Sequence, residues 1–196
     1  MYNVGILLFN DIELMDFAGP CEVFSVTSEL NEYGLFKVFT VTWDGNPVKT
    51  VNGLKVIPDF SFENHPPVDI LVIPGGVGTK TEMDRDSVLS WTKMNYENSK
   101  ITMSVCSGAR ILGKLGLLDN AKSTTHHEVM EHLLQIAPTT MIETDKRFVD
   151  NGKIMTSGGI SAGIDLSLYV VGKLFGKDIA DKTAVYMEYG DWKKLV

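Results

Sequence analysis

Cysteine is scarce in this sequence, with only two among 196 residues, which is too few for a disulfide framework. Long hydrophobic runs are also missing. A membrane span needs a run of about 18 apolar residues, and no run in this sequence is that long. The start, Met1-Tyr2-Asn3, has no basic residues and no small-residue cleavage site, so a signal peptide is not expected. These absences favour a cytoplasmic protein, in which a cysteine is either buried filler or a working thiol.

Positive charge is limited too: 18 Lys and Arg stand against 25 Asp and Glu, for a net charge of -7. Nucleic acids and anionic membrane surfaces bind dense Lys/Arg patches, and the sequence contains none, so neither is expected as a partner. The hydrophobic residues, at 44%, are enough for a packed core. The length predicts one domain over residues 1–196.

Short apolar runs alternate with helical patterns along the chain. The predicted strands are Val4–Phe9, Phe36–Trp43, Asp69–Ile73, Ile101–Val105 and Ser123–Thr125, with hairpins over Pro47–Pro58 and Arg147–Thr156. The predicted helices are Asp16–Leu30, Ser87–Glu97, Ser107–Leu115, Glu128–Ile136, Ser161–Phe175 and Asp178–Tyr186. This alternation predicts an α/β fold with a mainly parallel sheet covered on both faces. Ligands of such sheets bind beyond the carboxyl ends of the strands.

Cys106 follows a predicted buried strand and precedes a predicted helix, which is the arrangement of a nucleophile elbow. Gly108 leaves room for that helix to pack closely. The helix start offers free amides and a positive dipole end, and such a position is expected to lower a thiol pKa from about 8.5 to about 3.5–7.5. The alternative is a buried structural cysteine. Cys21, on the apolar stripe of the first predicted helix, fits core packing better.

Two further segments fall at predicted strand ends. Pro74-Gly75-Gly76 allows close backbone approach to a ligand and leaves amides free to face developing negative charge, although it is also an ordinary turn. Asp16 lies between Met15 and Phe17, where apolar neighbours are expected to raise its pKa. It could supply the acid or base that a thiol needs, or simply cap the helix. Glu13 is a nearby competitor for the acid role.

The histidines do not predict a metal site. The segment beginning at His127 has Glu131 at the position where a zincin helix needs histidine, and His132 comes one residue too late. His126 follows a predicted strand, so it could approach the thiol or lie on the surface. No phosphate-binding loop or dinucleotide fingerprint occurs. The residues therefore predict neither a zinc site nor a nucleotide-binding loop.

Five segments together resemble the ThiJ/PfpI superfamily, and most of all the branch that holds the isonitrile hydratases and the ligand domains of related AraC-type regulators. They are Asp16–Phe24, Ile73–Gly76, Ser104–Gly108, Thr124–His126 and Gly158–Asp165. The resemblance implies a flavodoxin-like three-layer sandwich, commonly a homodimer, with Cys106 as nucleophile and Asp16 as its acid/base partner. Ser107 falls where the hydratases usually carry Thr and keeps the hydroxyl. Gly75 and Gly76 would donate backbone hydrogen bonds, and the reaction would convert an isonitrile to an N-substituted formamide without a metal or organic cofactor.

Three residues depart from that branch: His127 replaces a usual Trp, Ser104 replaces an elbow Gly, and Arg110 puts a cation in the first turn after the elbow.

The resemblance also leaves other functions open. An amidase or protease of this superfamily tends to carry His directly after the nucleophile, where this chain has Ser107. A glyoxalase or stress-protection enzyme needs little more than the same thiol and acid. A non-enzymatic sensor acting through Cys106 is a further alternative. A DNA-binding regulator is not expected, because only seven residues follow Tyr189.

Overall fold

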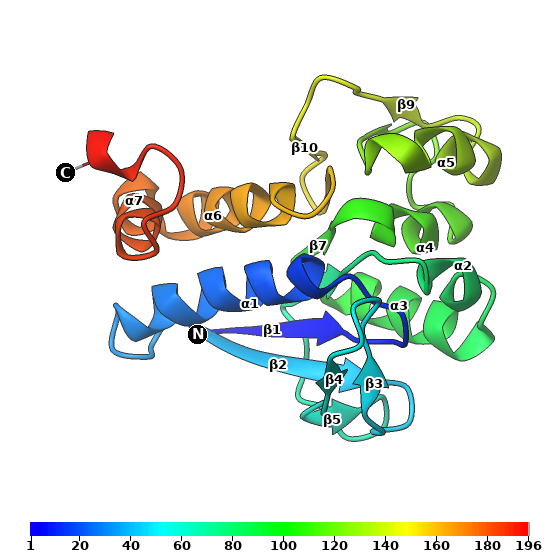
Figure 1. Cartoon of the computed structure of the whole chain (residues 1–196), viewed down its shortest axis with the longest axis horizontal. Helices are drawn as coiled ribbons and strands as arrows, with labels where there is room; N and C mark the ends of the chain where they lie inside the picture. The colour runs from blue at the N-terminus through cyan, green and yellow to red at the C-terminus, as the bar shows by residue number, and fades with distance from the viewer. Residues whose placement is uncertain (196) are drawn as a thin grey trace.

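The computed structural model describes residues 1–195 and is built around a seven-stranded sheet (Figure 1). The strand order is β10-β11-β7-β6-β1-β2-β5. The strands are β1 Tyr2–Leu7, β2 Phe36–Thr42, β5 Phe60–Ser61, β6 Ile70–Ile73, β7 Ile101–Ser104, β10 Phe148–Asp150 and β11 Ile154–Ser157. Every neighbouring pair is parallel except β10–β11. The predicted mainly parallel sheet is confirmed.

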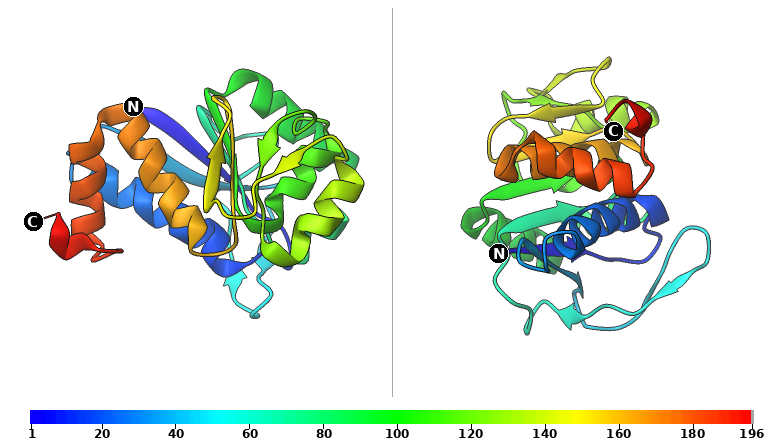
Figure 2. Two further views of the ribbon diagram at one scale, coloured as in Figure 1. Left: turned by 90° about the horizontal axis from the view of Figure 1, so that it is seen from above. Right: turned by 90° about the vertical axis from the view of Figure 1, so that its left-hand side faces the viewer.

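Helices cover both faces of this sheet, which gives three layers (Figure 2). On one face lie α1 Leu14–Glu29, α6 Ala162–Phe175 and α7 Lys177–Tyr186, which pack against one another. On the other face lie α2 Thr79–Glu82, α3 Asp86–Asn98, α4 Ala109–Lys114 and α5 Met130–Ile136. No helix within residues 1–195 is long and apolar enough to cross a membrane.

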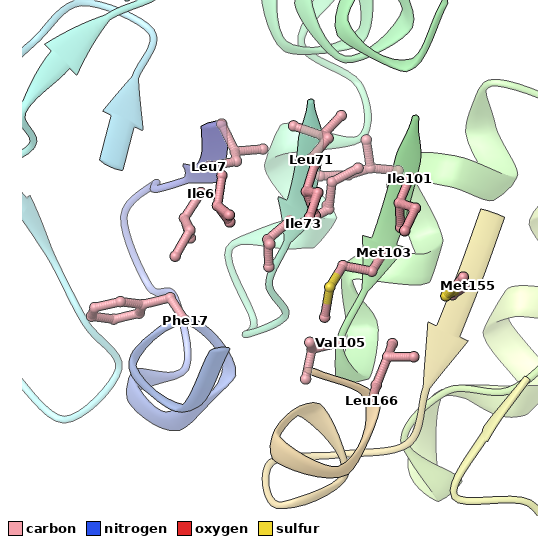
Figure 3. Packing of buried hydrophobic residues seen from close by; sticks show 14 of the residues in the cluster. Ile6, Leu7, Phe17, Leu71, Ile73, Ile101, Met103, Val105, Met155 and Leu166 are labelled. Carbon is pink, nitrogen blue, oxygen red and sulfur yellow. The ribbon is translucent and has the colours of Figure 1, made fainter. Parts of the chain in front are cut away.

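The central strands are apolar because both of their faces are covered. All four residues of β6 are fully buried, as expected for a strand with helices above and below it. Figure 3 shows side chains of β7 and the residue after it, Met103 and Val105, lying beside Leu166 of α6. This packing fixes α6 against the end of β7, close to Cys106.

Both predicted hairpins are confirmed. In the first, β3 Val48–Lys49 pairs antiparallel with β4 Lys55–Val56 as a separate two-stranded sheet. In the second, β10 and β11 are the two arms. Edge strand β5 and the one-turn helix α2 were not predicted, because each is too short to show a period.

The predicted strand Ser123–Thr125 is confirmed at Ser123 and is wrong at Thr124 and Thr125. Strand β8 covers Lys122–Ser123 and pairs with β9 Met141–Ile142 in a separate sheet. Thr124 and Thr125 are instead held by side-chain bonds: the Thr124 amide donates to Thr156 Oγ1 at 2.8 Å, and Thr125 Oγ1 donates to the Cys106 carbonyl at 2.6 Å. The segment therefore supports the end of β7 without extending the sheet.

The strand register brings the segments after β6, β7 and β11 together. Ser104 at the end of β7 pairs with Ile73 of β6 on one side and with Thr156 of β11 on the other. Because the three strands run parallel and end level, the residues that follow them meet at one edge. Those residues include Gly75, Cys106 and Gly158.

Candidate active site

Cys106 occupies the strand-to-helix junction with a backbone φ of +55°, a left-handed conformation that residues other than glycine seldom adopt. The surroundings hold it there, as they must for a strained position. Its amide donates to the Gly158 carbonyl at 3.0 Å, and its own carbonyl accepts from Thr125 Oγ1. A short 3-10 turn over Cys106–Gly108 then leads into α4. The predicted elbow geometry is present.

Gly108 is the residue that lets the elbow turn so tightly. A Cβ at this position would lie 2.1 Å from the Ile73 carbonyl oxygen, which is backbone and cannot move aside cheaply. We expect Gly108→Ala to lower the free energy of unfolding by about 1–3 kcal/mol or more and to displace Cys106, measured by thermal denaturation and thiol reactivity. The matched control is Gly172→Ala inside α6, where the new Cβ would lie 3.6 Å from the Ala180 Cβ of α7. That change should be neutral or stabilising, and an equal loss in both variants would contradict the argument.

Asp16 lies against the Cys106 thiol and is fully buried. It is in the first turn of α1, whose N-cap is Glu13, so the helix-capping alternative is wrong. Its Oδ2 accepts from the Gly75 amide at 3.0 Å, and its Oδ1 accepts from the Ile160 amide at 3.1 Å. Burial raises the pKa of Asp16 from 3.8 to about 7, against the lowering effect of Cys106 and of these two amides. The expected raised pKa is confirmed.

The thiol does not behave as the sequence predicted. Burial and the neighbouring Asp16 carboxylate raise the pKa of Cys106 to about 12, and hydrogen bonds from Ser107 oppose this only in part. The prediction of a lowered pKa and a resting thiolate is therefore wrong. The helix that follows is too short to supply a strong dipole, because α4 spans only Ala109–Lys114. At neutral pH the thiol is therefore neutral, and the Asp16 carboxyl group beside it titrates near that pH.

Ser107 links the Gly75-Gly76 pair to the elbow through two hydrogen bonds with Gly76. The Gly76 amide donates to Ser107 Oγ at 2.9 Å, and Ser107 Oγ donates to the Gly76 carbonyl at 3.0 Å. The Gly75 amide is taken by Asp16. In this structure neither glycine amide is free, so both hold other site residues in place. Their expected role as donors to a substrate stays a prediction that requires these bonds to exchange.

A cleft of about 280 Å³ opens beside the thiol. His126 forms part of its wall, with its ring packed over Gly159 and its Nδ1 accepting from the Glu128 amide at 3.3 Å. The cleft is lined by Glu13, Gly76, Val77, Lys80, Cys106, Ser107, Arg110, His126, Glu128, Val129 and Ile160. The six candidate residues predicted from the sequence thus lie together. Cys106, Ser107, Gly76 and His126 line the cleft. Asp16 lies directly behind Cys106, and Gly75 is bonded to Asp16.

Sequence reasoning missed the residues that reach the site from distant segments. Ile160 has a left-handed φ of +50° and directs its amide at Asp16; the glycines before it were the only signal. Thr79 and Lys80 come from the unpredicted helix α2, and nothing in the sequence marked them. Within residues 1–195, no group of three His, Cys, Asp or Glu side chains is placed to hold a metal ion.

A cysteine at a strained elbow, backed by a buried carboxyl group at the carboxyl edge of a parallel sheet, defines a class of α/β proteins with a thiol-centred site. The sequence profile of the DJ-1/PfpI family matches residues 2–173. The chain belongs to this family.

Named relatives span enzymes and regulators. The chain is 31% identical to isonitrile hydratase from Pseudomonas putida over 95% of its own length and 78% of that protein. It is 26% identical to the HTH-type transcriptional regulator GbdR from Pseudomonas aeruginosa over 91% of the chain, and spans about half of that regulator, 48%. A crystal structure of a ThiJ/PfpI family protein from Pseudomonas syringae superposes with a TM-score of 0.85 at 28% identity, covering 96% of this chain and 75% of that one.

Proposed function

We propose that this protein is a cysteine-dependent hydratase that adds water to an isonitrile and releases an N-substituted formamide. The observation that supports this best is the pairing of Cys106, strained at the elbow, with Asp16, whose pKa of about 7 lets it accept and return a proton at neutral pH. A group with that pKa is efficient as a general acid and base. The similarity to an isonitrile hydratase agrees with this chemistry.

In the first step, the Asp16 carboxylate takes the proton of the Cys106 thiol while the sulfur bonds to the terminal isonitrile carbon. The lone pair of that carbon then takes the proton from Asp16. The product is a thioimidate, R–N=CH–S, attached to the enzyme. Because the resting thiol is neutral, the attack depends on Asp16 as the base, and activity should rise as the pH passes about 7.

In the second step, water adds to the thioimidate carbon as Asp16 accepts one of its protons and passes it to the nitrogen. The carbon–sulfur bond breaks, and the remaining proton returns to the sulfur. Isonitrile and water are consumed, the formamide R–NH–CHO leaves, and Cys106 and Asp16 are restored. Ser107 and Gly76 keep the elbow in place through their paired hydrogen bonds.

The test is to incubate the purified protein with a panel of alkyl isonitriles, methylglyoxal and small amides, and to follow products by proton NMR. We expect formamide from the isonitriles, at a rate that increases between pH 6 and pH 8. Turnover of methylglyoxal with none of the isonitriles would instead support the glyoxalase or stress-protection alternative. Turnover of the amides alone would support the amidase alternative.

The structure disfavours one rival function. A sensor of oxidants depends on a thiolate, because susceptibility to oxidation follows thiolate character and exposure. Cys106 is 8% exposed and its pKa is raised to about 12. A resting thiol of this kind reacts slowly with oxidants, so an enzyme in which Asp16 activates the thiol only during turnover fits the site better.

A further inference from the structure

The cleft contains a buried cation that no acidic side chain within the described residues neutralises. Arg110, on the first turn of α4, is 6% exposed and lines the cleft beside Cys106. Its Nε donates to His132 Nδ1 at 2.9 Å and its Nη1 donates to Thr79 Oγ1 at 2.9 Å. The Thr79 hydroxyl carries no charge, and burial together with the nearby cations Arg110 and Lys80 lowers the pKa of His132, which disfavours its charged form. Within residues 1–195, Arg110 belongs to none of the ion pairs.

A buried guanidinium without a counter-charge is costly, since charged groups in protein interiors are normally paired. Burial accordingly lowers the pKa of Arg110, while a charge on Cys106 would act in the opposite direction. Arginine nevertheless stays protonated in proteins. Its Nη2 makes no hydrogen bond with any described residue and is not among the occluded unpaired atoms. Nη2 therefore keeps unused donors that are not occluded, on a residue that lines the cleft.

A second cation stands at the same wall. Lys80, on α2, lines the cleft, is exposed, and forms no ion pair with any residue in the described range. Two acids also line the cleft, Glu13 and Glu128. Glu128 is 77% exposed and lies 3.9 Å from His127, and Glu13 adjoins Asp16. Within residues 1–195 neither acid forms an ion pair with Arg110 or Lys80. Arg110 and Lys80 both act on His132, so together they form one positive wall of the cleft, which Cys106 also lines.

We propose that this wall binds the carboxylate of a small anionic substrate, with Arg110 as its main partner and Lys80 as the second, while the electrophilic carbon of the substrate meets Cys106. A guanidinium suits a carboxylate because its planar donors match the two oxygens. The cleft, at about 280 Å³, falls at the lower end of ligand sites, so it fits a molecule of a few carbon atoms. This assignment rests on the proposed function for the reaction, but the charge preference can be tested without it.

The test compares two alkylating reagents of nearly equal size at Cys106, iodoacetate and neutral iodoacetamide. Each forms a carbon–sulfur bond and expels iodide. The protein carries Cys21→Ser, so that only one thiol reacts, and the rates are followed by intact-protein mass spectrometry. The iodoacetate-to-iodoacetamide rate ratio is divided by the same ratio for 2-mercaptoethanol. We expect a normalised ratio of at least about ten, the effect of one charge-assisted hydrogen bond.

Arg110→Gln should bring the normalised ratio down to about one, and Arg110→Lys should leave it between the two. The matched control is Lys114→Gln, which removes a cation from the same helix where it faces Asp84 at 2.6 Å, outside the cleft; the ratio should not change. A normalised ratio of one or less in the protein that retains Arg110 overturns the proposal. This result does not depend on whether Arg110→Gln folds. Equal slowing of both reagents in Arg110→Gln also overturns it, because Arg110 would then serve the thiol.

Hydration of isocyanoacetate and of its methyl ester gives the corresponding substrate test. The proposal expects a larger kcat/KM for the carboxylate than for the ester, and a loss of that preference in Arg110→Gln through KM. If neither compound is hydrated while the alkylation ratio is high, the proposed function fails and the anion site stands. If both are hydrated equally and the alkylation ratio is one, the anion site fails and the proposed function stands.

Discussion

Replacing Cys106 by alanine is expected to abolish isonitrile hydration, with a fall in kcat of at least about 10³-fold. The sulfur forms the covalent bond of the first step, and no other described nucleophile lies against Asp16. Alanine keeps the backbone but removes the attacking atom. The fold should survive, because Cys106 contributes a small side chain at the edge of the core and its φ of +55° costs alanine no more than cysteine. Formamide production and thermal denaturation measure the two effects separately.

Cys21 provides the matched control. It is the other free cysteine and lies half-buried in α1, where its side chain packs against the core. Burial raises the pKa of Cys21, as it does for Cys106, but Cys21 has Ser25 and Glu22 as neighbours and lies outside the cleft. Cys21→Ala should therefore keep nearly full activity. Hydration that persists in Cys106→Ala, or disappears in Cys21→Ala, would remove the mechanism.

The elbow was predictable because its signals are local. An apolar strand, Cys106 and Gly108 lie within one short stretch of sequence. The apolar neighbours of Asp16 are likewise adjacent to it in the sequence. The α/β layering was equally predictable, because buried parallel strands and helices have distinct periods. Strand β8 was misplaced because Thr124 and Thr125 have strand-like composition but bind through side chains.

The electrostatics of the site could not be predicted in this way. The pKa of Cys106 depends on Asp16, which lies 90 positions earlier in the chain, and on how deeply both are buried. Burial and the like charge of Asp16 raise the pKa of Cys106, and neither can be seen in the local sequence that predicts the helix dipole. The setting of Arg110 was hidden for the same reason, since its partners Thr79 and His132 come from α2 and α5.

Asp16→Asn is expected to lower hydration by about 10²- to 10⁴-fold, the usual contribution of a general acid or base. Asparagine has nearly the same shape, but it cannot take the proton of the thiol, and the thiol is neutral at rest. In the unchanged protein, kcat/KM should rise with pH through about 7 as the carboxylate forms. The residual activity of Asp16→Asn should lack this rise.

The same substitution should change how stability depends on pH. The pKa of Asp16 is 3.8 as an ordinary aspartate and about 7 in the fold, so between these values the folded state holds a proton that the unfolded state has lost. Stability therefore falls as the pH rises through this window, by up to about 1.4 kcal/mol per pH unit, or about 4 kcal/mol in all. It should level off above about pH 7. Asp16→Asn removes this component of the fall.

Denaturant unfolding at several pH values between 4 and 8 measures the difference. Asparagine offers one oxygen to the two amides, of Gly75 and Ile160, that Asp16 now accepts from, which adds a constant cost of about 1–3 kcal/mol. Because that cost does not change with pH, the informative quantity is the slope of the free energy of unfolding against pH. The difference in stability between the variant and the unchanged protein should shift in favour of the variant as the pH rises. Glu63→Gln, at an exposed position far from the cleft, should follow the unchanged slope. Parallel curves for Asp16→Asn and the unchanged protein would show that Asp16 titrates normally, and the proton-transfer role built on it would fail.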